Sequence, residues 1–387
     1  MYIEQDRAFT EGILSKLIGI FSVTGSEAEI GDYIHSQLKE SGVDTVTRQP
    51  VTEHRFNVVA TIKGERPGPR ILFTGHMDTV PAGDGWETDP FSAVKRDGRM
   101  YGRGSLDMKG GIAAVLSTAK YVVEHKDQLA GELLIAFVAD EEAYSTGVDT
   151  LIRNGLAADF GIAAEPEGDK AIVGALGKML IRADIKGIAS HGCQPEKGLN
   201  AIEEGARFLA ALDQIPLLSH PNMPSQPYVT LKIEGGFKEY SIVVPESCSI
   251  LINKHTVPAE TKEYVIGEME KLVRKLHLKA KFAFTPETPY YAAYDIGTQV
   301  PYLEKISSIF QDVVGKPLRC AYGTGVSDNN RIVPLTGIPV VSIGPCGDGM
   351  HSCNEWVSLE SVHQMDMIYR SFVLSNEEVR NGRRDRG

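Results

Sequence analysis

Histidine and acidic side chains recur in this sequence where apolar segments end. The segment 70–75 is predicted to be a buried strand, and His76 and Asp78 follow it directly. In extended backbone, residues two apart project to the same side, so this imidazole and this carboxylate leave the strand tip together. Proteins support a metal-ligating histidine with a nearby carboxylate in this way. A single His-x-Asp is more often a polar surface turn, so the metal interpretation depends on the sites that follow.

Four further candidate residues stand at comparable places in the chain. In chain order they are Asp107, Glu142, Glu165 and His351. Glu142 ends a run of three consecutive acids after the predicted strand 132–138, and bound cations would offset their mutual repulsion. Asp107 precedes a predicted helix over 112–124, and taken alone it is better explained as an N-cap.

The elements that must position these residues alternate between strand and helix. Apolar spacing predicts helices at 7–21, 26–41, 112–124, 299–314 and 358–374, and strands at 44–49, 56–62, 70–75, 132–138, 159–164 and 338–343. The candidate residues follow strand ends, and open α/β sheets place their sites at the carboxyl ends of strands.

The order of predicted strands and helices changes between residues 177 and 290. The pattern there predicts a strand at 178–187, a helix at 198–213, strands at 228–234 and 248–255, a helix at 260–276 and a strand at 279–285. This βαββαβ order suits a small two-layer α+β domain inserted into the first. We therefore expect a first domain formed by residues 1–176 and 291–387 and an inserted domain formed by residues 177–290.

Two imidazoles and three carboxylates form a ligand set suited to zinc, for which Co²⁺ or Mn²⁺ often substitutes. Two such ions about 3.5–4 Å apart, sharing one carboxylate, would leave a bridging position where water is acidified. Glu141 is next to a candidate ligand and is needed by neither ion. It is therefore the candidate general base that takes a proton from water and delivers it to a leaving amine.

Bulk properties exclude several other functions. The formal net charge of −11 argues against nucleic acid as a partner. No apolar run approaches the roughly 20 residues of a membrane helix, and the N-terminus has no apolar signal core. Five scattered cysteines without a Cys-x-x-Cys pair predict a reducing, cytoplasmic location. The glycines at 102–111 lack the spacing of a dinucleotide-binding fingerprint, which excludes a Rossmann-type oxidoreductase.

Six motifs, in this order, resemble the co-catalytic di-zinc hydrolases, the family of acetylornithine deacetylase, succinyl-diaminopimelate desuccinylase, aminoacylase and glutamate carboxypeptidase. They are Gly75-His76-Met77-Asp78-Thr79-Val80-Pro81, Gly102-Arg103-Gly104 with Asp107-Met108-Lys109-Gly110-Gly111, Glu141-Glu142, Glu165-Pro166, Ser190-His191-Gly192 and His351-x-x-Asn354-Glu355. The resemblance covers nearly the whole chain. It implies an α/β fold with a mixed-sheet catalytic domain and an inserted lid and dimerisation domain.

The resemblance also implies a role for each candidate residue. His76 and Glu165 would hold one zinc ion, Glu142 and His351 the other, and Asp107 would bridge them, with a cis peptide bond to Met108. Asp78 would orient His76, and Glu141 would be the general base and then the general acid. His191 would come from the lid of a partner subunit in a homodimer and stabilise the tetrahedral oxyanion.

Two departures from the family pattern put the substrate in doubt. Many relatives have Asp-x-Arg in the third lid strand, where this chain has Asn253-Lys254-His255, and Asn330 stands where an arginine is frequent. Lys254 or His255 would still offer a cation, but not the bidentate fork of arginine.

The expected activity is hydrolysis of the amide bond of an N-acyl amino acid by a metal-bridged hydroxide. The alternatives are a di/tripeptidase or carboxypeptidase acting on short peptides, and a non-catalytic binding protein on the same fold. The binding protein is disfavoured because Glu141 and all five candidate ligands are present.

Overall fold

The computed structural model describes residues 4–239 and 241–375, which form two compact units. The first comprises Met1–Gly174, Ile296–Ala321 and Ser327–Gly387, and the second comprises Ala175–Asp295 and Tyr322–Val326. The sequence did not predict that Tyr322–Val326 would accompany the inserted segment. Among the described residues, no helix has both the length and the apolar composition needed to cross a membrane.

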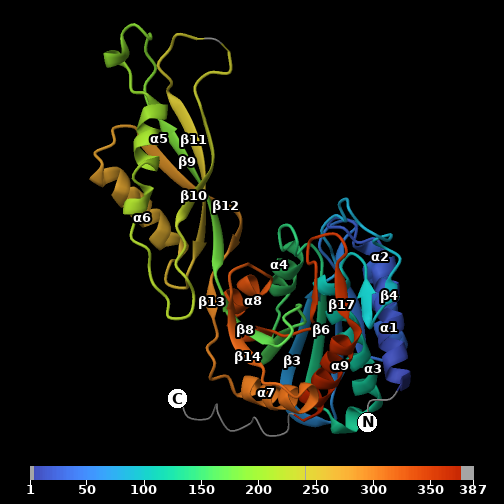
Figure 1. The fold of residues 1–387 in the computed structure, drawn as a ribbon. Helices are drawn as coiled ribbons and strands as arrows, with labels where there is room; N and C mark the ends of the chain where they lie inside the picture. The colour runs from blue at the N-terminus through green and yellow to red at the C-terminus, as the bar shows by residue number, and fades with distance from the viewer. Residues whose placement is uncertain (1–3, 240, 376–387) are drawn as a thin grey trace. The chain divides into compact units, whose positions relative to one another are not determined.

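The first unit, hereafter the catalytic unit, is built on a mixed sheet with the strand order β1-β2-β6-β3-β7-β15-β8, and β14 pairs with β8 (Figure 1). Its strands are β1 (Thr45–Pro50), β2 (Phe56–Lys63), β3 (Arg66–His76), β6 (Ala130–Val138), β7 (Phe160–Ala163), β8 (Lys170–Ala175), β14 (Arg319–Gly323) and β15 (Val340–Ser342). The strands β6, β3, β7 and β15 run parallel, whereas β1 and β2 are antiparallel to their neighbours. β3 is apolar over consecutive residues because both faces of a central parallel strand are covered.

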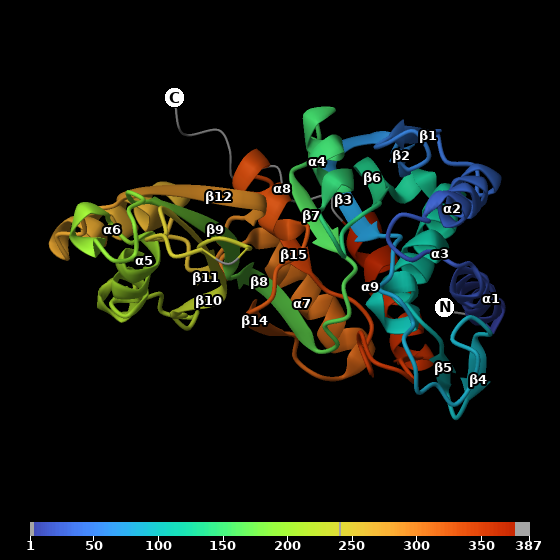
Figure 2. The same cartoon turned by 90° about the horizontal axis from the view of Figure 1, so that it is seen from above.

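Helices cover both faces of this sheet (Figure 2). They are α1 (Glu4–Gly19), α2 (Ala28–Glu40), α3 (Gly110–Glu124), α4 (Thr146–Arg153), α7 (Pro301–Val314), α8 (Asn329–Thr336) and α9 (Leu359–Leu374). α3 packs on the sheet together with α9 and α1, and α4 packs with α8 on an apolar cluster that includes Leu72, Val148 and Ile332. The sequence did not predict α4 or α8, each of which is only 8 residues long.

A small antiparallel sheet joins two distant parts of the catalytic unit. It has the order β16-β17-β5-β4, with β4 (Val94–Arg96), β5 (Arg99–Tyr101), β16 (Gly347–Asp348) and β17 (Trp356–Ser358). Because β5 pairs with β17, the segment that leads to Asp107 lies beside the segment that follows His351.

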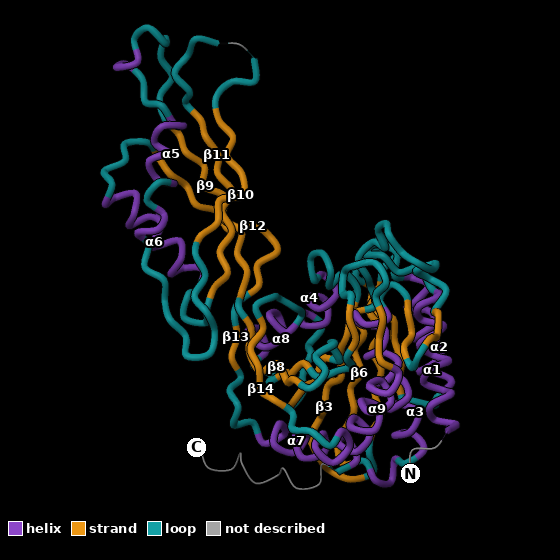
Figure 3. The backbone as a smooth tube through the Cα atoms, viewed as in Figure 1, coloured by secondary structure: helices purple, strands orange, loops and turns teal. Residues whose placement is uncertain are grey.

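The second unit, hereafter the inserted unit, is a four-stranded antiparallel sheet with the order β10-β11-β9-β12 and two helices (Figure 3). The elements are β9 (Gly177–Lys186), α5 (Ala201–Leu209), β10 (Tyr228–Gly235), β11 (Ser247–Thr256), α6 (Lys262–Lys275) and β12 (Lys281–Tyr291), with β13 (Tyr294–Asp295) at the end of the segment. Alternate residues of β9, among them Met179 and Ile181, are buried in a core shared with both helices. The predicted βαββαβ order is confirmed.

Candidate active site

Parallel strand ends gather the candidate residues at one edge of the large sheet. His76 is the last residue of β3, and it pairs in register with Val138, the last residue of the neighbouring strand β6. Glu141 and Glu142 lie in the turn that follows that strand, and Glu165 follows β7 on the other side of β3. Because these strands are parallel neighbours, their carboxyl ends bring the side chains together.

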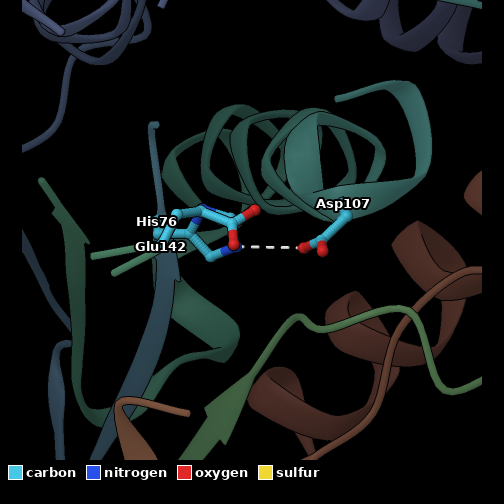
Figure 4. A group of neighbouring side chains, drawn as sticks. All are labelled: His76, Asp107 and Glu142. Carbon is cyan, nitrogen blue, oxygen red and sulfur yellow. Dashed lines mark hydrogen bonds and ion pairs between the residues drawn. The ribbon is translucent and has the colours of Figure 1, made fainter. Parts of the chain in front are cut away.

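Asp107 lies between two histidines. Its Oδ1 is 3.0 Å from Nε2 of His76, and its Oδ2 is 3.1 Å from Nε2 of His351 (Figure 4 shows the first contact). The same His351 nitrogen is 3.0 Å from Oε1 of Glu142. One carboxylate is thus shared between two imidazoles, as a bridging ligand would be.

The prediction of Asp107 as an N-cap, made for that residue taken alone, is wrong. Lys109 occupies the N-cap position of α3, and its side chain makes no capping hydrogen bond. Asp107 is instead part of a helical turn, Ser105–Lys109, in which its backbone is non-helical, and the Asp107–Met108 peptide bond is cis as the resemblance implied. Its two carboxylate oxygens contact His76 and His351 and do not cap the helix.

The donor set fits a bound cation. Nδ1 of His76 lies 2.9 Å from the main-chain oxygen of Asp78, so the neutral ring donates its proton there. The lone pair of Nε2 then faces a carboxylate oxygen of Asp107, an arrangement that requires a proton or a metal ion in between. His76, Asp107 and Glu142 each offer a ligand atom, and these three atoms lie within 4.8 Å of one another.

Without cations the site carries an excess of buried acid. Burial is the main cause that raises the pKa of Glu165 to about 8; the charge of His76 opposes this shift and the charge of Asp107 adds to it. Burial also raises the pKa of Glu141 well above its ordinary value, against the effect of His76 and with the help of nearby acids. For His76, burial disfavours the charged form, but Asp107 and Glu165 outweigh it and raise the pKa. A divalent ion among these groups would reverse the local balance and favour the ionised carboxylates.

The side chain of Asp78 lies beside His76 and also makes hydrogen bonds that the sequence did not predict. Its carboxylate Oδ1 accepts the backbone N–H of Glu141 at 3.1 Å, and Oδ2 accepts that of Glu142 at 3.1 Å and the hydroxyl of Thr24 at 2.8 Å. Nδ1 of His76 is 3.7 Å from the Asp78 carboxylate and closer to its main-chain oxygen. The side chain of Asp78 therefore holds the turn that carries Glu141 and Glu142, and its backbone orients His76.

His191 belongs to the inserted unit and is exposed on a loop. Its Nδ1 accepts the backbone N–H of Cys193 at 3.2 Å, which leaves the proton of the neutral ring on Nε2. A histidine held in this tautomer can donate a hydrogen bond through Nε2.

Lys254, one of the two residues predicted to offer a substrate cation, is engaged elsewhere. Lys254 is fully buried, donates to the main-chain oxygen of Gln226 at 2.7 Å and lies 2.9 Å from Glu260. Burial and the charge of Lys178 lower the pKa of His255, which favours its neutral form. The prediction that Lys254 or His255 offers a cation is therefore wrong for Lys254 and disfavoured for His255.

Sequence reasoning missed Asp328. This residue is buried just before α8, and its charge raises the pKa of both Glu141 and Glu165. Burial raises its own pKa to about 7, and its Oδ1 has no hydrogen-bond partner among the described residues. The signal for Asp328 in the sequence is a lone acid in the glycine-containing segment 323–330, two residues before Asn330.

Comparison with known proteins places this arrangement in a family. The model described as Peptidase family M20/M25/M40 matches residues 72–375. The succinyl-diaminopimelate desuccinylase of Sulfurovum sp. is 29% identical over 376 residues, which cover 93% of this chain and 97% of that protein. The enzyme of the same name from Sulfurimonas denitrificans is 30% identical over 323 residues, covering 79% and 84%.

Solved structures agree on the fold. The aminopeptidase PepT from Bacillus cereus has a TM-score of 0.78 at 22% identity, covering 95% of this chain and 98% of that one. The Bacillus subtilis YXEP protein, described as a dinuclear metal-binding peptidase of the M20 family, has a TM-score of 0.74 at 18% identity, covering 96% and 98%.

The predicted resemblance and fold class are thus confirmed. The site is built around a carboxylate shared by two histidines, and the matched segment begins four residues before His76 and extends to the end of α9. This chain belongs to the M20/M25/M40 peptidase family and is a metal-dependent hydrolase that acts on amide bonds.

Proposed function

We propose that this enzyme is a zinc-dependent deacylase that cleaves the amide bond of an N-acyl amino acid, of the deacetylase or desuccinylase type. The observation that carries the proposal is the Asp107 carboxylate, shared between His76 and His351, with Glu141 close enough to His76 for its charge to raise the pKa of that imidazole. Two borderline metal ions match this set of imidazole and carboxylate donors, and Co²⁺ or Mn²⁺ would be expected to substitute.

In this proposal His76 and Glu165 hold one ion, Glu142 and His351 hold the other, and Asp107 contributes to both. When bound, the ions supply Lewis acidity that activates water and polarises the scissile carbonyl. Glu141 accepts a proton at its carboxylate and then delivers it to the leaving amine nitrogen. Asp78 keeps Glu141 aligned through the hydrogen bond to its backbone N–H.

The choice of an N-acyl amino acid rests on the sequence relatives. The desuccinylases of Sulfurovum sp. and Sulfurimonas denitrificans match over most of both chains. The peptidase structures are below 25% identity, so they support the fold and not a substrate. A di/tripeptidase or carboxypeptidase on short peptides is therefore the second candidate.

A substrate panel tests this choice. Metal-free enzyme is reloaded with Zn²⁺ or Co²⁺ and assayed against N-succinyl and N-acetyl amino acids, dipeptides and tripeptides. The deacylase proposal predicts a kcat/KM at least about 100-fold higher for an N-acyl amino acid than for any peptide, a difference of roughly 2.7 kcal/mol. A preference for peptides would establish the second candidate, and no turnover of any amide by the loaded enzyme would remove both.

We further propose that the inserted segment 177–290 serves as a lid and as the interface of a homodimer. The edge strand β10 supports this, because Val229, Leu231 and Ile233 are about half exposed along it. In this arrangement His191, from the partner subunit, would stabilise the developing oxyanion through its Nε2 proton.

The substitution His191→Ala tests that role. We expect kcat to fall by about 100-fold or more while the metal content stays at the wild-type level, because a transition-state donor is lost and no ligand is. His54→Ala serves as the control, because His54 is also an exposed histidine but belongs to the catalytic unit. Full activity of His191→Ala would remove the lid histidine from the proposed mechanism.

A further inference from the structure

Glu355 is a fully buried carboxylate whose two oxygens accept four hydrogen bonds from one short segment of the chain. Its Oε2 accepts from Nη1 of Arg103 at 2.5 Å and from the backbone N–H of Gly104 at 2.9 Å. Its Oε1 accepts from the backbone N–H groups of Leu106 at 2.8 Å and of Asp107 at 3.0 Å. Three of these donors are main-chain groups of the loop that ends at Asp107.

The segment also has other main-chain hydrogen bonds, among them the N–H of Arg103 to the oxygen of Pro90 at 2.8 Å and the N–H of Lys109 to the oxygen of Gly104 at 2.8 Å, but the amides of Gly104, Leu106 and Asp107 donate to Glu355. It lies before α3, and Gly104 has a left-handed φ of 78°, so its amides do not point along a regular helix or strand. A buried backbone N–H without a partner is costly, and here one side chain satisfies three of them. Glu355 thus supplies the hydrogen-bond acceptors for the backbone N–H groups of Gly104, Leu106 and Asp107.

The same carboxylate connects two parts of the metal site. Glu355 follows His351 by four residues, and its main-chain oxygen accepts the N–H of Gly102 at 3.0 Å. The segment that carries His351 is therefore joined through Glu355 to the segment that carries Asp107. These are the two residues whose Nε2 and Oδ2 atoms lie 3.1 Å apart.

Arg103 completes the arrangement without reaching the metal ligands. Its guanidinium lies over the ring of Trp86, 5.3 Å from the centroid, and also donates to the main-chain oxygen of Ala82 at 3.2 Å. It balances the charge of Glu355 in a place where an unpaired carboxylate would be strongly unfavourable. The carboxylate can then stay ionised and accept from three amides at once.

We propose that Glu355 is a positioning residue that sets Asp107 against His351 before any cation binds, so that the shared carboxylate is already in place for both ions. This inference rests on the proposed metal centre and is independent of which amide the enzyme cleaves. It assigns Glu355 no contact with the substrate or with the ions.

The substitution Glu355→Gln tests the proposal. Glutamine keeps the size of the side chain but replaces one accepting oxygen with an amino group, which cannot accept an amide hydrogen. We expect the Zn²⁺ affinity, measured by competition with a chromogenic chelator, to fall about 10- to 100-fold, as for other groups that orient metal ligands. The visible absorption spectrum of the Co²⁺-loaded variant should also change, because the geometry of the shared carboxylate changes.

Glu360→Gln is the matched control. It makes the same chemical change five residues later, at an exposed carboxylate that forms an ion pair with Arg7 at the surface. Its Zn²⁺ affinity and Co²⁺ spectrum should equal those of the wild type. If Glu355→Gln matches this control in both measurements, the proposal is refuted; because neither measurement uses a substrate, that result leaves the proposed deacylase activity standing.

A measurement on the wild-type protein decides the case if Glu355→Gln does not fold. Hydrogen exchange of the peptide covering Gly104–Asp107 is compared between the metal-free and the Zn²⁺-loaded protein. The proposal predicts slow exchange in both forms, with rates within about tenfold, because Glu355 holds these amides without the ions. Fast exchange in the metal-free form, with protection only after Zn²⁺ is added, would show that the ions order the loop and would overturn the proposal.

Discussion

Each unit buries charged side chains, but the charges balance in the inserted unit and not at the catalytic site. In the inserted unit, Lys254 and Glu260 form a closed pair. Glu260 also accepts the N–H groups of Leu218 and Val257, so both of its oxygens have donors. At the catalytic site, carboxylates outnumber the two histidines, and burial raises the pKa of Glu165 and Asp328.

This difference separates a structural ion pair from a functional cluster. A buried pair that is fully satisfied requires nothing from outside the chain. An excess of carboxylates at strand ends is unfavourable until cations arrive, and groups with shifted pKa values cluster at functional sites for this reason. The comparison also explains why Lys254 does not serve as a substrate cation, since Glu260 already neutralises it.

The largest expected effect comes from removing the proposed general base. Glu141→Gln should lower kcat by about 10²- to 10⁴-fold, because the variant cannot accept the proton from water. Metal content, measured by elemental analysis, should be unchanged because Glu141 is not a proposed ligand. The exposed Glu304→Gln on α7 is the control. Unchanged turnover in Glu141→Gln would contradict the assignment.

A smaller effect is expected from breaking the buried ion pair between Lys254 and Glu260 in the inserted unit. Lys254→Met should lower the free energy of unfolding of that unit by about 3–5 kcal/mol, because Glu260 is left as an uncompensated buried charge. Native-state hydrogen exchange of the amides in β11 measures this change. Zn²⁺ affinity should stay at the wild-type value, because the pair lies outside the catalytic unit.

Two further variants sharpen that result. The double variant Lys254→Met/Glu260→Gln should recover much of the lost stability, because no unpaired charge remains. Arg182→Met, which breaks a partly exposed pair with Glu287 in the same sheet, should cost less than about 1 kcal/mol. A Lys254→Met cost as small as that of Arg182→Met would show that the buried pair is not the stabilising feature we describe.

The smallest expected effect is a pH dependence that appears only without metal. The pKa of Glu165 is raised to about 8 and that of Asp328 to about 7, against about 4 in an unfolded chain. Contacts with Asp107 and Glu142 raise the pKa of His351 to about 10. In each case the folded protein binds more protons than the unfolded chain, so stability falls as the pH rises through this range.

Thermal unfolding of the chelated enzyme should therefore show a melting temperature that decreases between about pH 5 and pH 8. Zn²⁺-loaded enzyme should melt at a higher temperature and should not show this decrease, because the bound ions take the place of the protons. Asp107, whose pKa is lowered by both histidines despite its burial, shifts stability only below the ordinary aspartate range. If the chelated and the Zn²⁺-loaded enzyme gave identical pH profiles, the buried charges of the catalytic site would not be unbalanced without cations, and the contrast with the inserted unit would be wrong.

The sequence predicted the long elements well, for a local reason. The periodicity of apolar residues predicts helices such as α3 and the alternating strand β9, and those residues pack as the periodicity requires. Short elements were missed. α4 and α8 span two turns each, and the strands of the small sheet have two or three residues, too few for a period to show.

Some roles could not be predicted because they depend on contacts between distant segments. The pattern at His76 and Asp78 predicted that the carboxylate would support the imidazole. In the structure that carboxylate lies 3.7 Å from Nδ1 of His76 and also accepts the backbone N–H groups of Glu141 and Glu142, which no local pattern predicted. Glu355 was visible in the sequence as part of a motif, but nothing local connects it with Arg103, 252 residues away.

The sequence alone determined which residue types stand at the ends of which strands, because strand and turn signals are local properties of the chain. Only the tertiary structure decided which of these side chains meet. Asp107 lies between His76 and His351, although His351 is 244 residues away from Asp107 in the sequence. Lys254 forms a buried ion pair with Glu260. Hydrogen bonds and metal–ligand contacts form or fail with differences of a few tenths of an ångström in the distance between two atoms, and the packing of the whole unit sets those distances.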